Sequence, residues 1–200
     1  MRAVKIGILL LGVCGCRSRD ASSNASRSES VAAREGADAT LLPPLDAAAR
    51  SREPPFEGTA GIVARDASVS AAALLRDVRS ARHVGYDRVV FEFSEGLPNY
   101  HVEYVDRPVR KCGSGDPTAL AGDAWLEIRF NPANAHDERG AATVNELERQ
   151  TKLGVLLELE QTCDFEAHVT WVLGLASPNR YRVLELSGPS RIAVDVLHEC

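Results

Sequence analysis

The stretch Tyr86–Phe93, YDRVVFEF, decides the fold class of this chain. Successive side chains of an extended strand point to opposite sides, so every second residue shares a face. One face of this stretch consists of Val89, Phe91 and Phe93, and the other carries Arg88, Val90 and Glu92. Such one-sided alternation is typical of antiparallel sheets that bury one face and expose the other. The stretch therefore predicts a half-buried β-strand.

Similar alternation recurs along the rest of the chain. Further strands are expected at residues 100–106, 124–130, 156–162, 165–173, 181–186 and 191–198. Within the stretch FEAHVTWVL, one apolar row is expected to contain Phe165, Ala167, Val169, Trp171 and Leu173. The turn-forming stretches EGLPN and SGPS separate neighbouring strands and predict hairpins. We therefore expect an all-β fold, either an antiparallel β-sandwich or an open barrel.

Two segments have a helical composition. The stretch SAAALLRDVRSARH, residues 70–83, is rich in Ala and Leu and begins with Ser70, a good helix N-cap. The pattern alone leaves open whether residues 68–79 form a helix or a strand. A short helix is expected within TVNELERQ, residues 143–150.

The chain begins with the features of an export signal. Arg2 and Lys5 precede the apolar run Ile6–Val13, which is too short to span a bilayer as a helix. The adjoining VCGC resembles the bacterial lipobox, in which a cysteine receives the lipid; Cys16 fits that position best and Cys14 fits it less well. We expect residues 1–15 to be a lipoprotein signal peptide. A plain secreted protein is the alternative.

Residues 16–57 differ sharply in composition from residues 58–200. The earlier stretch is dominated by Ser, Ala, Arg, Asp, Glu and Pro, and between Arg17 and Pro55 it contains no aromatic residue. Such a composition buries too little apolar surface to offset the entropy of ordering. It predicts a disordered tether, whose reach is about 35 Å for a flexible coil of about 40 residues. Residues 58–200 have the length of one domain with its own core.

The charge balance restricts the possible partners. Loss of the signal peptide removes Arg2 and Lys5, which leaves 21 Lys+Arg against 28 Asp+Glu, a formal charge of −7. An acidic domain is a poor match for nucleic-acid phosphates. There is also no polybasic segment to bind anionic lipid, so we expect membrane contact only through the lipid on Cys16. The expected location is the bacterial envelope, facing the periplasm or the exterior.

Three stretches resemble a known family. They are RDVRSARHVGYDRVVFEFSEGLPNYHVEYVD, DFEAHVTWVLGL and YRVLELSGPSRIAVDVLH, and the resemblance covers about residues 74–198. They resemble the AMIN-like domain of bacterial secreted proteins and lipoproteins. That domain is similar in layout to the AMIN domain of periplasmic N-acetylmuramoyl-L-alanine amidases, a non-catalytic β-sandwich that directs the enzyme to peptidoglycan. The resemblance implies a strand near residues 74–79 and an envelope location, and it assigns no site residue.

Two functional hypotheses from different classes remain. The first is a non-catalytic module that binds peptidoglycan or an envelope protein, without a cofactor. The second is an envelope hydrolase with an unrecognised active site. An edge strand that pairs with a partner's strand is a variant of the first hypothesis.

The cysteines of the domain predict one disulfide. Export to an oxidising compartment favours a bridge between Cys112 and Cys163, which would close a loop of about 50 residues. Cys200 is left over, either as a free thiol or as a competing partner. A catalytic role for Cys163 is disfavoured, because a strand pattern comes after it where an activated thiolate commonly has a helix N-terminus.

Charged and aromatic residues in the strands have two competing interpretations. Arg88 and Asp195 interrupt apolar runs, and charges so placed are usually paired. We expect a partly buried ion pair that fixes strand register, either between these two residues or between Arg88 and a neighbour of Glu92 across a strand. Alternatively, an aromatic platform with polar anchors would suit a sugar or a peptide. The residues of that possible ligand site are Tyr86, Arg88, Tyr104 and Trp125.

Neither the histidines nor the carboxylates form a motif. The five histidines are His83, His101, His136, His168 and His198, and their spacing matches no metal-binding motif, so we expect no metal site. A glycosidase pair could be formed among Asp87, Glu92, Glu127 and Asp195, but such chemistry depends on a separation that sequence does not give.

Overall fold

The computed structural model describes residues 56–94 and 96–199. The predicted signal peptide, the lipid-attachment residue Cys16, the tether up to residue 55 and Cys200 lie outside the described residues. In the part of the chain that is described, no helix is long and apolar enough to cross a membrane.

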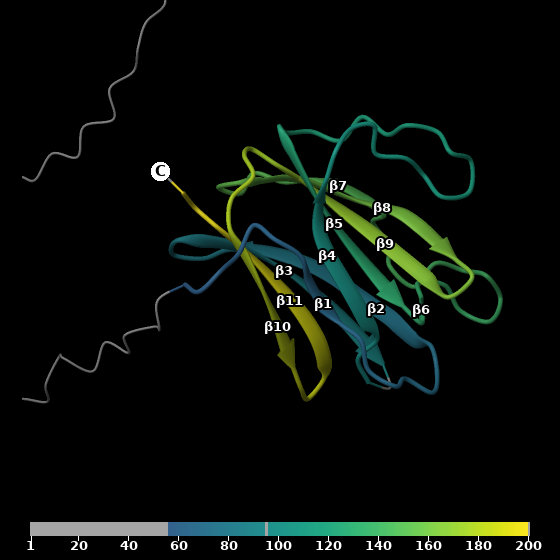
Figure 1. The fold of residues 1–200 in the computed structure, drawn as a ribbon. Helices are drawn as coiled ribbons and strands as arrows, with labels where there is room; N and C mark the ends of the chain where they lie inside the picture. The colour runs from purple at the N-terminus through teal and green to yellow at the C-terminus, as the bar shows by residue number, and fades with distance from the viewer. Residues whose placement is uncertain (1–55, 95, 200) are drawn as a thin grey trace, which may run out of the picture. The chain divides into compact units, whose positions relative to one another are not determined.

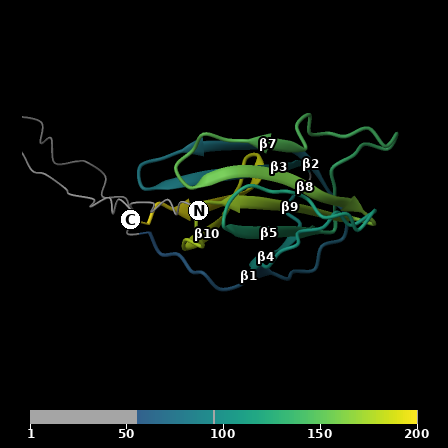
Figure 2. The same ribbon diagram turned by 90° about the horizontal axis from the view of Figure 1, so that it is seen from above.

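Two β-sheets pack face to face as a sandwich (Figures 1 and 2). The six-stranded sheet has the order β1-β4-β5-β9-β8-β7, and the five-stranded sheet has the order β10-β11-β3-β2-β6. The strands are β1 (Val63–Arg65), β2 (Ala73–Arg82), β3 (Tyr86–Ser94), β4 (Asn99–Val105), β5 (Ala124–Asn131), β6 (Ala133–Asn134), β7 (Glu148–Gln150), β8 (Leu156–Phe165), β9 (His168–Leu175), β10 (Tyr181–Leu186) and β11 (Ser190–Leu197). All named pairs are antiparallel except β2 with β6. The predicted all-β sandwich is confirmed.

The apolar faces of the two sheets meet in one core. The apolar side of β3 points inward, and the ring of Phe91 lies 5.0 Å from that of Phe130 and 6.0 Å from that of Trp171, both in edge-to-face geometry. All three side chains are fully buried. Edge-to-face aromatic pairs stabilise a core beyond the area they bury. The apolar residues that alternate along this stretch therefore form the side of β3 that faces the core.

Neither of the segments with helical composition forms a helix. The stretch near residue 74 is β2, which confirms the strand that the family resemblance implied. Its buried residues are Ala73, Leu75 and Val78, and an irregularity between Leu75 and Asp77 keeps Leu75 and Val78 on the core side. The helix expected within residues 143–150 is wrong, because Glu148–Gln150 pairs with β8 as an edge strand. Pairing with a neighbouring strand has overridden local helix propensity in both places.

The strand expected at residues 165–173 is interrupted. β8 ends at Phe165 and β9 begins at His168, and Glu166 and Ala167 form the turn between them. The predicted apolar row is therefore wrong at its first two members, because the chain reverses there. Phe165 is 62% exposed and does not enter the core.

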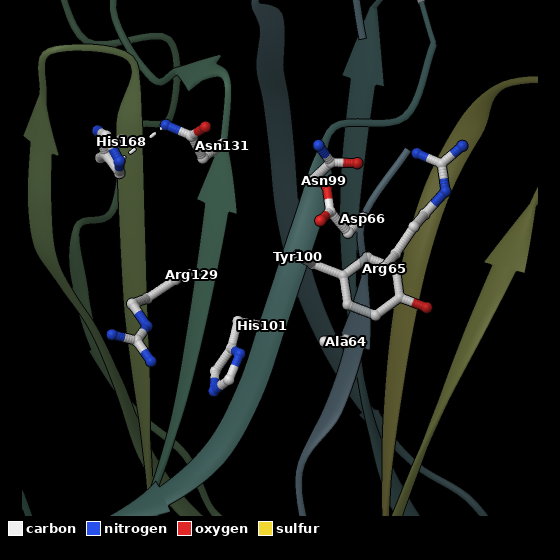
Figure 3. A pocket seen from close by; sticks show the side chains of 9 residues that line it. All are labelled: Ala64, Arg65, Asp66, Asn99, Tyr100, His101, Arg129, Asn131 and His168. Carbon is white, nitrogen blue, oxygen red and sulfur yellow. Dashed lines mark hydrogen bonds between the residues drawn. The ribbon is translucent and has the colours of Figure 1, made fainter. Parts of the chain in front are cut away.

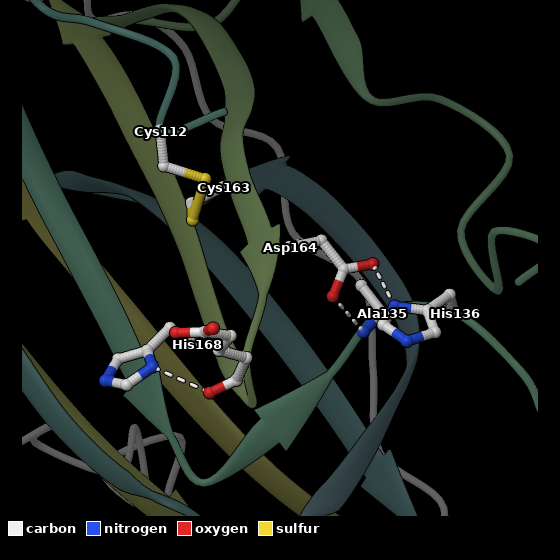
Figure 4. The surroundings of a disulfide bond; sticks show 7 residues. Cys112, Ala135, His136, Cys163, Asp164 and His168 are labelled. Carbon is white, nitrogen blue, oxygen red and sulfur yellow. Dashed lines mark hydrogen bonds and ion pairs between the residues drawn. A yellow bond between two sulfur atoms is a disulfide. The ribbon is translucent and has the colours of Figure 1, made fainter. Parts of the chain in front are cut away.

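A disulfide fixes the loop between β4 and β5 against the six-stranded sheet. Cys112 is bonded to Cys163 of β8, across a sequence separation of 51 residues (Figure 4). The same loop crosses β9 at Gly174, where a Cβ atom would lie 2.1 Å from the carbonyl oxygen of Ala121. Only glycine permits this close approach. Part of the outer face of the sheet is therefore covered.

The two ends of the sandwich are distinct. Phe56, the first described residue, lies 6.0 Å ring to ring from Tyr86, and Tyr86 pairs with Leu197 near the end of the described chain. We call this the proximal end. The opposite end, where Asn99 pairs with Asn131, is called the distal end. The described chain thus enters and leaves the domain at its proximal end.

Candidate functional site

A polar groove with a volume of about 520 Å³ lies at the distal end, on the outer side of the six-stranded sheet (Figure 3). It is open to solvent and crosses β1, β4, β5 and β9. Its lining residues are Ala64, Arg65, Asp66, Asn99, Tyr100, His101, Arg129, Asn131 and His168.

Strand register places the groove residues side by side. Asn99 of β4 is the cross-strand partner of Asn131 of β5, and His101 is the partner of Arg129. Cross-strand partners share a face of the sheet, as do residues two apart in one strand. The outward positions at the distal ends of β4 and β5 thus supply an imidazole, a guanidinium and two amides.

The guanidinium of Arg129 already has anionic partners. It forms an ion pair with Glu103, and its Nε lies 3.2 Å from Oε1 of Glu127. His101 Nε2 lies 3.1 Å from the same Glu103 carboxylate. Burial raises the pKa of Glu127 against the opposing effect of Arg129, and the nearby Glu103 raises it further. The charged side chains on this side of the groove are therefore paired with one another.

Arg65, on the other side of the groove, is also engaged. Its Nη1 donates to the carbonyl oxygens of Leu97 and Pro98, both at 3.2 Å, and its Nε lies 3.4 Å from Glu185. The Tyr100 hydroxyl donates to the same Glu185 carboxylate at 3.1 Å, and burial, followed by this bond, raises the pKa of Tyr100 to about 12. The groove is thus polar without an uncompensated guanidinium.

The imidazole of His168 is fixed by two hydrogen bonds. Its Nδ1 lies 2.9 Å from the carbonyl oxygen of Glu166, and its Nε2 lies 2.8 Å from Nδ2 of Asn131 (Figures 3 and 4). A carbonyl only accepts and the amide nitrogen of Asn131 only donates, so the pattern assigns the proton of a neutral ring to Nδ1. The ring orientation is therefore determined before any ligand arrives.

The turn next to His168 has an unfavourable backbone. Glu166 and Ala167 have φ angles of 50° and 59°, in the left-handed region that favours glycine. The amide of Ala133 donates to the carbonyl oxygen of Ala167 at 2.8 Å and holds the turn in this geometry. Positive φ at both central residues is the geometry that a tight two-residue hairpin turn requires.

The four residues expected to form one ligand site do not meet. Tyr86 and Arg88 lie on the outer face of the five-stranded sheet, whereas Trp125 lies on the outer face of the other sheet, with Arg107 stacked 4.2 Å from its ring. Tyr104 points between the sheets, and its hydroxyl donates to the carbonyl oxygen of Asn179 at 2.5 Å. Burial raises the pKa of Tyr104. The structure does not assemble this platform.

Arg88 and Asp195 lie side by side on β3 and β11. Arg88 donates to both carboxylate oxygens of Asp195, at 2.5 and 2.8 Å, and the Asp195 side chain is fully buried. Arg182 of β10 adds a third bond to Asp195, at 2.8 Å. The charged residues that interrupt the strands therefore form an ionic cluster across three neighbouring strands.

The residues considered for hydrolysis have other partners. Cys163 is in the disulfide, so its thiol is not available as a nucleophile. Asp87 accepts the amide protons of Val155 and Leu156, at 2.6 and 2.9 Å, and contacts His198 at 2.8 Å. Within residues 56–94 and 96–199, no group of three or more His, Cys, Asp or Glu side chains is placed to hold a metal ion.

The other three carboxylates that were considered for a glycosidase site form ion pairs with arginines. Glu92 binds Arg79 at 3.0 Å, Glu127 binds Arg129, and Asp195 binds Arg88. Glu92 and Asp195 lie on the outer face of the five-stranded sheet, and Glu127 lies on that of the six-stranded sheet. The structure does not gather the four carboxylates around one cavity.

Sequence analysis did not identify the groove as a site. Asn99 and Asn131 are ordinary residues for the end of a strand, and His168 was expected in mid-strand. The only local signal is a polar residue next to a turn at each position, which is common in β proteins. Their proximity depends on the pairing of β4, β5 and β9, which has no local signature.

Comparison with known proteins identifies one family. The family model described as the AMIN-like domain matches residues 73–198, which is more than half of the chain. No curated protein and no solved structure shows a significant match to the chain.

Proposed function

This chain belongs to the AMIN-like domain family, and from that membership we propose that it is a non-catalytic module that binds peptidoglycan in the bacterial envelope. The resemblance of its strands to the AMIN domain of cell-wall amidases supports the choice of ligand. A protein of the envelope is the alternative partner. A hydrolase is disfavoured, because the carboxylates and the cysteine considered for catalysis are each engaged by structural partners.

The position of the groove is the observation that carries this proposal. Phe56 packs at the proximal end, whereas Asn99, Asn131 and His168 lie at the distal end. A lipid on Cys16 would attach the chain to a membrane through a segment that joins the domain at Phe56. The groove is then at the end of the domain opposite its point of attachment.

The chemistry of the groove suits binding. Side chains of His101, Arg129 and Asn131 line an open surface, and the His168 ring is already oriented by Asn131 and Glu166. Preorganised polar groups lower the entropic cost of binding. An extended polymer requires an open surface of this kind more than an enclosed pocket.

The anchoring part of the proposal has its own test. Cells that express the full chain should carry it in the membrane fraction, and Cys16→Ser should release it from that fraction while Cys14→Ser leaves it there. Retention of the Cys16→Ser protein in the membrane fraction would exclude Cys16 as the lipid-attachment residue.

Wall binding is tested by co-sedimentation with purified peptidoglycan sacculi. The chain from residue 17 onward is mixed with sacculi at low and at high salt, and the pellet is compared with a tube without sacculi. Retention at both salt concentrations is expected, because the guanidinium groups of the groove are already paired within the protein. Absence from the pellet at both would reject peptidoglycan as the ligand and leave the envelope protein partner.

A further inference from the structure

Beyond its first two residues, β2 forms an edge of the five-stranded sheet. On the side away from β3, β6 pairs with Ala73 and Leu74, and no strand of the described chain pairs with the rest of β2 (Figure 1). Further along β2, the side chains of Arg79 and Ala81 are exposed. We call residues 78–82 the open edge of β2. A sheet edge of this kind presents backbone N–H and C=O groups that can pair with another strand.

The pairing with β3 identifies the backbone groups of the open edge that face outward. In an antiparallel pair, every second residue bonds to the neighbouring strand and the residues between them point away from it. The amide of His83 donates to the carbonyl oxygen of Tyr86 at 2.8 Å, next to the turn that joins β2 to β3. Counting back from His83, the residues that point away from β3 are Arg82, Ser80 and Val78.

The open edge is only weakly occupied by the protein itself. Within the described residues, Arg149 of β7 is the side chain that donates to it: Nη2 lies 3.4 Å from the carbonyl oxygen of Val78 and 3.5 Å from Oγ of Ser80. Both distances exceed the usual range of about 2.7–3.2 Å for such bonds. The outward N–H and C=O groups of Ser80 and Arg82 are therefore available to a further strand.

The opposite edge of the same sheet, formed by β10, is less available. Thr59 exchanges two backbone hydrogen bonds with Tyr181, both at 2.8 Å, so the chain itself pairs with the start of this edge. The side chain of Glu185 crosses to Tyr100 and Arg65 of the other sheet. Of these two edges, that of β2 is the more open.

The open edge of β2 is basic, although the chain as a whole has 28 Asp+Glu against 23 Lys+Arg. Arg76, Arg79 and Arg82 all lie on β2. Arg149 reaches the same edge from β7. Arg79 is paired with carboxylates at 2.7 and 3.0 Å, whereas neither Arg76 nor Arg82 forms an ion pair with a described residue. The edge thus carries cations that have no anionic partner in the described part of the chain.

These cations argue against a second copy of the chain as the occupant. Two β2 strands paired edge to edge would bring Arg76, Arg79 and Arg82 of both copies close together, and like charges on neighbouring strands are destabilising. A strand with carboxylate side chains would instead supply anionic partners for Arg76 and Arg82. Charge complementarity therefore favours an acidic occupant.

We propose that the open edge of β2 binds an extended acidic segment of a partner protein as an added β-strand. Main-chain hydrogen bonds to Ser80 and Arg82 give affinity, and carboxylates that meet Arg76 and Arg82 give specificity. The groove of the proposed wall-binding function lies on the other sheet, over β1, β4, β5 and β9. The inference therefore adds a protein-binding surface and does not depend on wall binding.

The test uses an octapeptide of alternating glutamate and valine, (Glu-Val)4, with both ends blocked. Calorimetry measures its binding to the chain from residue 17 onward, and NMR follows the backbone amides. A (Lys-Val)4 peptide tests the charge preference, and (Glu-Val)4 methylated on every backbone nitrogen tests the hydrogen bonding. The variant Arg76→Gln/Arg82→Gln removes two cations from β2. Arg139→Gln, in the exposed loop between β6 and β7, is the matched control.

The acidic peptide should bind, and neither (Lys-Val)4 nor the methylated peptide should bind measurably. The double variant should weaken binding about fivefold or more, whereas Arg139→Gln should stay within about twofold of the parent chain. Hydrogen exchange at the amides of Ser80 and Arg82 should slow when the peptide binds, because these amides face outward in the free chain. The amide of Ala81 already bonds to β3, so its exchange should change little.

Four results would overturn the inference. The first is that (Glu-Val)4 does not bind, or binds as well when it is methylated. The second is equal binding of (Lys-Val)4, which would reject an acidic partner. The third is normal binding to the double variant, which would place the peptide elsewhere. The fourth is dimerisation of the chain without peptide, with slowed exchange at Ser80 and Arg82, which would make a second copy the occupant.

Two measurements keep this inference separate from wall binding and from misfolding. Sedimentation on sacculi should be the same for the double variant and the parent chain, because the groove is on the other sheet. Loss of sacculus retention in the double variant would instead make the edge part of the wall-binding surface and overturn the inference. Urea unfolding of the double variant should match that of the parent, which shows that weaker peptide binding is a local effect.

Discussion

Nη2 of Arg88 donates to Oδ2 of Asp195 over 2.8 Å, although the two residues are 107 positions apart in the chain. The pair joins β3 to β11, and Arg182 extends it to the edge strand β10. Asp195 is fully buried, and its two arginine partners are its cross-strand neighbours on β3 and β10, so the cluster matches the register of these three strands.

Replacing Asp195 should therefore lower the free energy of unfolding. Asp195→Asn removes the charge that two guanidiniums share, and breaking a buried pair in this way costs about 3–5 kcal/mol in the free energy of unfolding. Urea denaturation at pH 7 measures the loss. Glu146→Gln, in an exposed pair with Arg149, is the control and should cost less than about 1 kcal/mol. Equal losses for both variants would show that the cluster adds no more than a surface pair.

Asp87 should make stability depend on pH. Burial acts to raise the pKa of Asp87, but hydrogen bonds from the amides of Leu156 and Val155 and from His198 outweigh it and hold the pKa below its ordinary value. A lowered pKa in the folded state means that the ionised carboxylate stabilises the fold above the unfolded pKa of about 3.9. That contribution is lost as the pH falls through the lower folded value.

The variant Asp87→Asn tests this contribution. It should lose about 2 kcal/mol at pH 7, because the amides and His198 lose a charged acceptor. The difference from the parent chain should shrink at pH 3 and below, as measured by urea unfolding across the pH range. A constant Asp87→Asn difference from pH 7 to pH 2 would contradict the assignment.

The disulfide should contribute to stability through the unfolded chain. Replacing both Cys112 and Cys163 by Ser frees a loop of about 50 residues and should cost about 2–4 kcal/mol. Guanidinium unfolding of the two proteins gives the difference. Under strong reducing conditions the parent chain and the double variant should unfold alike, and a difference that persists there would point to altered packing instead.

Substitutions in the turn after Phe165 should raise the free energy of unfolding. Both central residues have positive φ, which an Asn-Gly pair adopts readily. Glu166→Asn combined with Ala167→Gly should raise the free energy of unfolding by about 1–2 kcal/mol. Ala81→Gly, in the extended part of β2, is the control and should lower it by about 0.5–1 kcal/mol. A double variant less stable than the parent would mean that the turn carries no strain.

Several elements were predictable because their signals are local. The alternation in residues 86–93 requires only neighbouring residues, and the same holds for the strands at 124–130 and 181–198. The pairing of Cys112 with Cys163 was predictable from loop composition together with the expectation of an oxidising compartment. Where two tendencies competed locally, as in residues 143–150, composition favoured a helix, and pairing with β8 decided for a strand.

The candidate site was not predictable, because its residues are brought together by contacts between distant parts of the chain. Phe165 was expected in the core, because FEAHVTWVL alternates through a turn that no glycine, proline or asparagine marks. The groove depends on the register of β4 against β5 and of β5 against β9, which aligns Asn99, Asn131 and His168. Tyr86 and Trp125 have similar local patterns, yet they lie on opposite outer faces of the sandwich.

The sequence by itself determined that this chain is an all-β member of its family with paired cysteines and charged residues in its strands. Those features arise from side-chain periodicity and composition, which act between near neighbours. Only the tertiary structure decided that Asp195 has two arginine partners, that Phe165 is exposed, and that a polar groove lies at the end opposite Phe56. Each of these depends on contacts between strands far apart in the chain, and hydrogen-bonded register, not local preference, determines which residues meet.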